Sequence, residues 1–168
     1  MNKLQLLVFA AALALAADQP GVRAALSPVN QRKPAADFAF EDASGKTVTL
    51  AKLRGKVVVL DFWATWCHGC KQEIPWFSEF QTRYAAKGLA VVGVSLDEGG
   101  WKDVKPFLAS HNIPYRIVVG DDPLAKKYAI ENMPDTFLID RKGNVAAVYR
   151  GLVDRNDIET NIKTLLER

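Results

Sequence analysis

The residues best suited to chemistry are Cys67 and Cys70, the two cysteines of this 168-residue chain. They follow the apolar run of residues 57–64, which is typical of a strand buried on both faces, and they begin a helical pattern. The free N–H groups and the dipole at a helix start favour a nucleophilic thiolate. Because residues i and i+3 share a helix face, the two sulfurs can meet. The spacing predicts a reversible dithiol–disulfide couple with one exposed, activated sulfur and one recessed sulfur.

Other uses of such a pair fit less well. A structural disulfide closing this four-residue loop would gain only about 2 kcal/mol from chain entropy. A zinc site needs four ligands, and beyond the cysteines the chain offers only His68 and His111 as soft ligands. Covalent haem attachment needs a histidine directly after the second cysteine, where Lys71 stands. We therefore expect a redox role with no metal and no bound cofactor.

The N-terminal residues predict export. Residues 1–16 carry Lys3, a short apolar run and an A-x-A pattern at 14–16, which is the form of a secretory signal peptide. The run is short for a membrane-spanning helix, so an uncleaved anchor is the less favoured alternative. Residues 17–36 are rich in proline and alanine and predict a flexible lead-in, with the folded domain at 37–168. The expected location is the periplasm or cell envelope, which is an oxidising compartment.

The composition is that of one globular domain, with 49% hydrophobic and 24% charged residues. Lysine and arginine are scattered along the chain, so we expect no nucleic-acid partner. After a β-hairpin at 38–40 and 48–50, strand and helix patterns alternate. The expected elements are strand 57–64, helix 67–87 bent at Pro75, strand 89–96, helix 101–110, strand 115–119, helix 124–128 capped by Asp121 or Asp122, a hairpin at 136–140 and 145–149, and a helix from 156 or 157 to 167. This order predicts an α/β fold with a central mixed sheet and helices on both faces.

Four motifs together resemble the thioredoxin-like family, and more narrowly the TlpA/ResA-like thiol–disulfide oxidoreductases of the bacterial cell envelope. They are the strand LDFWATWC, the CxxC followed by Glu73 and Pro75, the MPDTFLID segment around Pro134, and the lead-in GKTVTLAKLRGK. The resemblance covers about residues 37–168 and implies a thioredoxin-like fold in which the hairpin is an N-terminal extension.

The resemblance also implies roles for single residues. Cys67 matches the exposed attacking cysteine and Cys70 the resolving cysteine. Asp61 matches a buried acid beneath the pair, and Glu73 matches an acid that this branch places one helical turn further on. From the residues alone, a buried Asp61 would have a raised pKa and could take the proton of Cys70 during resolution. Glu73 would otherwise be an ordinary surface glutamate.

Further residues are expected to contact the substrate. The resemblance makes Trp66 the aromatic before the motif, and it places Met133 and a cis Pro134 opposite the disulfide, where a substrate chain pairs like an added strand. The spacer His68-Gly69 departs from relatives that have proline before the second cysteine. His68 either adds positive charge beside the thiolate or is a solvated spacer.

Two further positions bear on the proton chemistry and the metal alternatives. Gly93 stands where cytoplasmic thioredoxins have the lysine that partners the buried acid. We interpret His111, which follows a predicted helix, as structural.

The leading hypothesis is an exported thiol–disulfide oxidoreductase that reduces disulfides of client proteins and is itself reduced by a membrane electron donor, in cytochrome c maturation or envelope redox homeostasis. A thiol oxidase or isomerase is the same chemistry in other directions. A thiol peroxidase would need a Pro-x-x-x-Thr-x-x-Cys loop, which does not precede Cys67. A copper carrier of this fold would need CxxxC and a distant histidine, and this chain has CxxC.

Overall fold

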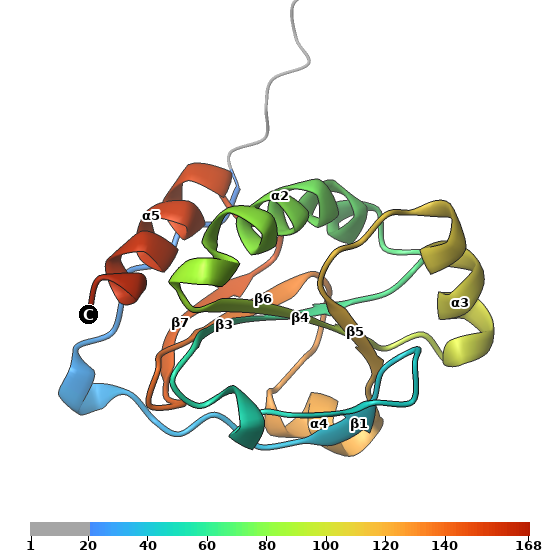
Figure 1. Cartoon of the computed structure of the whole chain (residues 1–168), viewed down its shortest axis with the longest axis horizontal. Coiled ribbons are helices and arrows are strands. Elements are labelled where there is room, and N and C mark those ends of the chain that lie inside the picture. Colours follow the sequence, from blue (N-terminus) through green and yellow to red (C-terminus); the bar gives the residue numbers. More distant parts are fainter. Residues whose placement is uncertain (1–20) are drawn as a thin grey trace, which may run out of the picture.

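The computed structural model describes residues 21–168, and these form one mixed five-stranded sheet with a small separate hairpin. The sheet order is β5-β4-β3-β6-β7, and β3 lies at its centre (Figure 1). β3 pairs in parallel with β4 and antiparallel with β6, while β5 extends the parallel side and β7 the antiparallel side. The strands are β3 (Val57–Trp63), β4 (Leu89–Ser95), β5 (Arg116–Val119), β6 (Asp135–Ile139) and β7 (Val145–Arg150).

Helices cover both faces of this sheet. α2 (His68–Tyr84) and α5 (Arg155–Leu166) lie on one face, with α3 (Trp101–Ser110) beside the β5 edge (Figure 1). α4 (Asp122–Lys127) and the antiparallel hairpin of β1 (Ala39–Glu41) and β2 (Thr47–Thr49) lie on the other face. Short 3-10 helices occupy Val29–Gln31, Ala51–Leu53 and Ala85–Lys87. The predicted α/β fold, with its hairpin extension, is confirmed.

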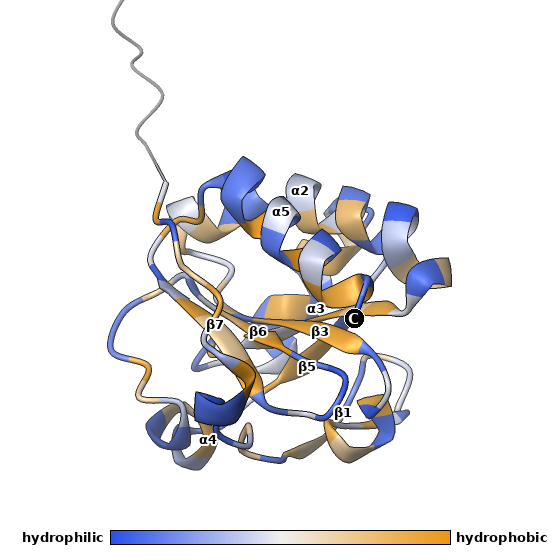
Figure 2. Ribbon diagram, turned by 90° about the vertical axis from the view of Figure 1, so that its left-hand side faces the viewer, coloured by the Kyte–Doolittle hydropathy of each residue, from blue (hydrophilic) through white to orange (hydrophobic). Residues whose placement is uncertain are grey.

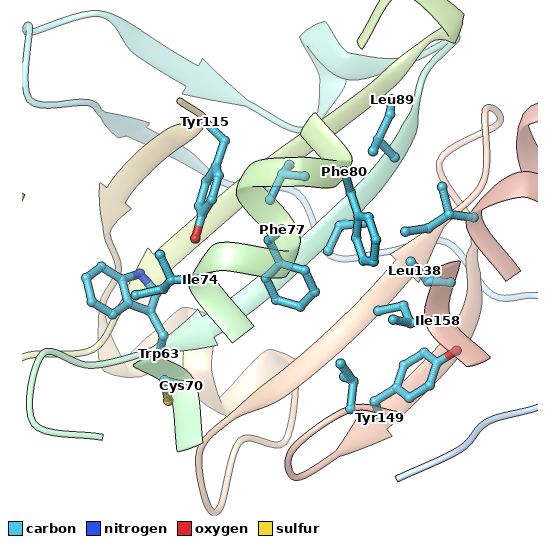
Figure 3. Close-up of a cluster of buried hydrophobic side chains, with 14 of the residues drawn as sticks. Trp63, Cys70, Ile74, Phe77, Phe80, Leu89, Tyr115, Leu138, Tyr149 and Ile158 are labelled. Carbon is cyan, nitrogen blue, oxygen red and sulfur yellow. The ribbon is translucent and has the colours of Figure 1, made fainter. Parts of the chain in front are cut away.

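The central strand divides its side chains between two cores, and this explains its unbroken apolar run. All seven residues of β3 are buried. Val57, Val59 and Trp63 join the core beneath α2 and α5, whereas Val58, Leu60 and Phe62 join the core beneath α4 and the hairpin. Figure 3 shows the first core, where aromatic rings of α2 pack between Trp63 and the β6 side of the sheet. The hydrophobic colouring of the sheet strands in Figure 2 reflects this double burial.

The predicted elements are confirmed with ends that move by one or two residues. α4 begins two residues earlier than expected, because the Asp121 carboxylate caps it by accepting the Leu124 N–H at 2.8 Å. Gly88 follows the α2 region with φ of 98°, a left-handed conformation that ends the helical stretch before β4. Pro75 lies inside α2, and the helix continues on both sides of it.

The expectation of a flexible lead-in does not hold for residues 21–36. Ser27 donates its N–H to Ala146 O at 2.8 Å, and Val145 donates its N–H to Lys33 O at 2.9 Å. The segment therefore follows β7, the edge strand of the sheet, and supplies partners to backbone groups that an edge strand leaves open. Composition did not reveal this order, because backbone hydrogen bonds need no periodic pattern of apolar side chains.

The predicted signal peptide lies outside the described residues. Within residues 21–168, no helix has the length and apolar character needed to cross a membrane.

Candidate redox site

The cysteines lie where the central strand turns into the first helix of the sheet. Cys67 is the N-cap of α2, and its sulfur accepts the N–H of Cys70 at 3.2 Å. The two cysteines form a disulfide with a Cα–Cα distance of 5.3 Å. The predicted reach of one sulfur to the other is therefore confirmed. A strand buried on both faces and followed directly by a helix places the pair at the carboxyl end of the central strand.

The expected exposure of Cys67 needs correction. Cys67 is only 5% exposed, compared with 0% for Cys70. The reason is that Cys67 Sγ turns toward the helix, where it joins Cys70 and accepts its N–H. Cys67 is more exposed than Cys70, as predicted, but the difference in exposure is small in the disulfide form. The neighbouring Trp66 is 66% exposed, a large fraction for an indole ring, so the surface beside the disulfide is apolar.

The turn before Cys67 is held by an acid that we did not predict from the sequence. Asp97 accepts the Thr65 N–H at 3.0 and 3.1 Å and the Thr65 hydroxyl at 2.6 Å. Its second oxygen also accepts the Ser95 hydroxyl at 2.7 Å. Asp97 follows β4 as Ala64 follows β3, and these parallel strands end at the same sheet edge. The sequence signal that could have predicted this role is an acid just after a buried parallel strand.

The segment around Pro134 lies against the motif spacer. The Met133–Pro134 peptide bond is cis, as expected. A Cβ atom built on Gly69 would lie 3.3 Å from Pro134 Cδ, which is a tight contact. The small spacer residue therefore allows the helix start and the proline to approach closely. Met133 is partly buried against the α2 core, so it presents only part of its side chain to solvent.

Asp61 lies buried in the face of the sheet that carries α2. It is 1% exposed and lies on the same face of β3 as Val59 and Trp63, whose side chains join the α2 core. One oxygen accepts the Thr136 hydroxyl at 3.4 Å, and the other has no hydrogen-bond partner among the described residues. Burial away from water raises the pKa of Asp61 to about 7, against the weaker lowering effect of Thr136. The predicted buried acid is therefore present.

The strand beside Asp61 offers it no cation. Gly93 is the β4 residue paired with Asp61, as the sequence comparison with cytoplasmic thioredoxins implied. A Cβ atom at Gly93 would lie 2.6 Å from Ile117 Cδ1 and 3.0 Å from Trp63 Nε1. These two side chains fill the space that a longer residue would need. Desolvation consequently raises the pKa of Asp61, and no ion pair to β4 opposes this effect.

Glu73 is buried and not a surface glutamate. It is 0% exposed, and its Oε1 accepts the Val153 N–H at 2.7 Å. Burial raises the pKa of Glu73 well above its usual range, the charge of Asp61 raises it further, and the Val153 N–H opposes both effects. Its Oε2 has no partner among residues 21–168. Cys70 and Glu73 stand three residues apart on one face of α2, which the sequence spacing did predict.

The negative charges of the buried acids influence one another. The negative charge of Asp135 contributes to the raised pKa values of both Asp61 and Glu73, and the charges of these two acids help to raise the pKa of the buried Tyr115. Like charges this close cannot all be present without a large cost. The group therefore holds at least one proton near neutral pH, directly beneath the start of α2.

The two histidines occupy different ends of the molecule. His68 is exposed at the start of α2, within the motif. His111 follows α3, stacks on Phe107 with ring centroids 3.9 Å apart, and lines a cavity with residues that precede β5. Because α3 runs back from the carboxyl edge of the sheet, it carries His111 to the opposite edge from the cysteines. The fold does not bring His111 to the sulfurs as a third ligand.

Comparison with known proteins identifies the family. The model of the AhpC/TSA family matches residues 32–148, which include the cysteines, Asp61, Glu73 and Pro134. The chain belongs to the AhpC/TSA family. This family assignment agrees with the thioredoxin-like fold and covers the β-hairpin as well as the central sheet.

Individual relatives show which type of thiol–disulfide protein the chain resembles. The chain is 31% identical over 136 residues to the thioredoxin-like protein YneN of Bacillus subtilis, covering 80% of this chain and 79% of that protein. It is 31% identical over 132 residues to the thiol-disulfide oxidoreductase ResA of Geobacillus thermodenitrificans, covering 78% of this chain and 75% of ResA. These values place the chain among the thiol–disulfide oxidoreductases of the ResA type.

Solved structures give the same result. A protein of Chlorobium tepidum assigned as the thiol:disulfide interchange protein DsbE superposes with a TM-score of 0.77 at 36% identity, covering 80% of this chain and 96% of that one. A thioredoxin family thiol:disulfide interchange protein from the same organism superposes with a TM-score of 0.73 at 30% identity, with coverage of 81% and 97%. The protein is therefore a thiol–disulfide oxidoreductase with a thioredoxin-like fold.

Proposed function

We propose that this protein is exported and reduces disulfides of client proteins through Cys67 and Cys70. The observation that carries the proposal is the disulfide at the start of α2, with Pro134 against its spacer and two proton-holding acids on the same side of the sheet. A structural disulfide needs neither the acids nor the exposed Trp66. The ResA and DsbE relatives support the same chemistry.

The reaction proceeds through a mixed disulfide. In the reduced protein, the Cys67 thiolate attacks one sulfur of the client disulfide, and the second client sulfur leaves as a thiolate. The Cys70 thiolate then attacks Cys67 Sγ, which forms the Cys67–Cys70 disulfide and releases the first client sulfur. Two electrons pass to the client, and the two client thiolates take up two protons. A membrane electron donor with its own dithiol returns the protein to the reduced form.

Cys70 needs a base because a buried thiol does not ionise readily. We assign this role to Asp61, whose pKa of about 7 makes it an acceptor that is half-ionised near neutral pH. Glu73 shares the same buried region, and its raised pKa, caused first by burial and then by the charge of Asp61, disfavours a second negative charge near the attacking thiolate. Proton transfer from Cys70 to Asp61 would therefore accompany resolution.

The client binds at the surface next to the disulfide. Its extended chain pairs with the backbone before Pro134 in the manner of an added strand, and Trp66 supplies apolar contact. Met133 borders this surface from the partly buried side. His68 is exposed beside Cys67 and, when protonated, would stabilise the thiolate.

The direction and location are part of the proposal. The signal-peptide pattern supports export to the cell envelope. The resemblance to envelope thiol–disulfide oxidoreductases supports reduction of client disulfides there, including those of apocytochrome c. Peroxide reduction, which other members of this fold perform, is disfavoured because Leu60 and Ala64 stand where its loop needs proline and threonine.

Trapping of the mixed disulfide tests this function. In Cys70→Ser the resolving sulfur is absent, so we expect Cys67 to hold a disulfide-bonded model peptide in a stable adduct seen by mass spectrometry. Cys67→Ser is the matched control, because it leaves only the fully buried Cys70 and should form no adduct. A folded Cys70→Ser protein that captures no peptide would refute the exchange mechanism. The reduction potential of the couple, measured against glutathione or thioredoxin, decides between reductase and oxidase.

A further inference from the structure

The first described residues pair with the loop that follows β7, residues 151–154. Val22 forms a parallel bridge with Val153. The Val22 N–H donates to Leu152 O at 2.6 Å, and Val22 O accepts the Asp154 N–H at 2.8 Å. This segment lies beside α5 in Figure 1, far in sequence from the loop that it contacts.

The opposite side of the same loop faces the redox site. The Gly151 N–H donates to Pro134 O at 2.9 Å, and the Val153 N–H donates to Glu73 Oε1 at 2.7 Å. In an extended chain, successive residues point their backbone groups to opposite sides. One short loop therefore connects Val22 on one side with Pro134 and Glu73 on the other.

The fit between segment and loop is close. A Cβ atom at Gly21 would lie 2.3 Å from Val153 O, so any larger residue must displace backbone. Val22 Cγ2 lies 3.4 Å from the Cβ position of Gly151. Beyond this contact, α5 anchors the segment, since the Ala24 N–H donates to Asp157 at 3.1 Å and Asn161 donates to Ala24 O at 2.7 Å.

We propose that residues 21–24 are a positioning segment for the redox site, which fixes the loop at 151–154 and thereby holds the Val153 N–H on Glu73 and the Gly151 N–H on Pro134. These residues touch neither sulfur and act only through the loop. The kinetic consequence of this inference rests on the proposed function, whereas the structural consequence does not.

The kinetic consequence concerns the charge on Glu73. The Val153 N–H favours the ionised carboxylate and so lowers the pKa of Glu73, against burial and the charges of Asp61 and Asp135. The other ionisable groups facing this region are Tyr115 and, on α2 itself, Cys70. When the loop moves away, Glu73 loses its one hydrogen-bond donor and its pKa rises.

The structural test uses Gly21→Ala, with Ala25→Val as the matched control at an exposed position of the same segment. Amide hydrogen exchange of the whole protein should show at least ~10-fold faster exchange at Val153 and Gly151 in Gly21→Ala. The control should leave both amides unchanged. Val22→Ala, which removes only the contact with Gly151, should give a smaller effect of the same sign. Unchanged exchange at both amides in the folded variants would overturn the proposal.

The kinetic test uses the pH profile of exchange between the reduced protein and a disulfide-bonded peptide. Where the profile reports ionisation of Glu73, above the midpoint set by Asp61, Gly21→Ala should move this second midpoint upward by about half a pH unit, because a carboxylate without its donor ionises at higher pH. The shift should vanish in a Glu73→Gln background. If Glu73→Gln moves the midpoint but Gly21→Ala does not, the positioning role is wrong. If Glu73→Gln itself has no effect, the assigned role of Glu73 fails, and the amide exchange alone decides the positioning role.

Discussion

Two buried acids on neighbouring parallel strands, one within β3 and one just after β4, have opposite surroundings. Asp97, after β4, is 5% exposed and accepts hydrogen bonds from Thr65 and Ser95 with both of its oxygens. Asp61, in β3, is 1% exposed and accepts one long bond from Thr136. A buried carboxylate with several donors positions the chain around it, whereas one with a single long hydrogen bond has a raised pKa and can exchange a proton near neutral pH. Asp97 therefore has a structural role, and Asp61 is suited to proton transfer.

The largest expected effect comes from removing Asp97. Asp97→Ala leaves the Thr65 N–H and two hydroxyl groups without their acceptor, and we expect the free energy of unfolding to fall by about 2–4 kcal/mol. Denaturant unfolding measures this loss. Asp103→Ala is the control, because that exposed acid accepts only the Gly99 N–H and should change stability by less than about 0.5 kcal/mol. Equal stability of both variants would remove the distinction between the two regions.

Removing Asp61 should slow the reaction without lowering stability. Asp61→Asn keeps the size of the side chain but cannot accept the proton of Cys70, so resolution of a preformed mixed disulfide should slow about 100-fold at pH 7. Rapid-mixing kinetics of peptide release measure this step. Thermal stability at pH 8 should be unchanged or higher, because the variant carries no buried charge. A stable variant that resolves at the normal rate would exclude Asp61 as the base.

The oxidised protein should lose stability as the pH rises from about 4 to 7. The pKa of Asp61 is raised from 3.8 to about 7 in the folded state, so folding takes up a proton in this interval. The stability contributed by the protonated form is complete below the unfolded pKa and is lost as the pH approaches 7. We expect a decrease of roughly 3–4 kcal/mol. Asp61→Asn should flatten this part of the curve of melting temperature against pH.

The smallest expected effect concerns the single donor to Asp61. Thr136→Val removes a hydroxyl that bonds at 3.4 Å, which is long, so the pKa of Asp61 should rise by less than one unit. The midpoint of the pH profile of exchange should move upward by about 0.3 pH units. Thr65→Val, which removes a hydroxyl from Asp97 instead, is the matched variant and should leave the midpoint in place. A shift of the midpoint in Thr65→Val but not in Thr136→Val would contradict the assignment of proton transfer to Asp61.

Much of this site could be predicted from the sequence because local patterns specify it. The unbroken apolar run predicts β3, the CxxC spacing predicts the disulfide reach, and Asp61 within the run predicts a buried acid. Asp97 and the Val153 N–H were not predicted, since each depends on which strands and loops become neighbours in space. The binding of residues 21–36 along β7 was missed for the same reason, because its backbone hydrogen bonds have no side-chain signature.

The exposure of Cys67 also could not be predicted from its position at a helix start. Being first on α2 places the sulfur at the surface in principle, but its bond to Cys70 turns it inward, to 5% exposure. Glu73 shows the converse case. A glutamate in the first turns of a helix is commonly exposed, but this one shares the buried face of Cys70 and accepts the Val153 N–H of the loop after β7.

The most direct test is the reaction of the reduced protein with a disulfide-bonded peptide between pH 5 and 9. Our account predicts that one peptide disulfide consumes both Cys67 and Cys70 thiols, through a transient adduct, and that resolution accelerates with a midpoint near the pKa of Asp61. Peptide disulfides that stay intact while both thiols persist in the folded protein would contradict it.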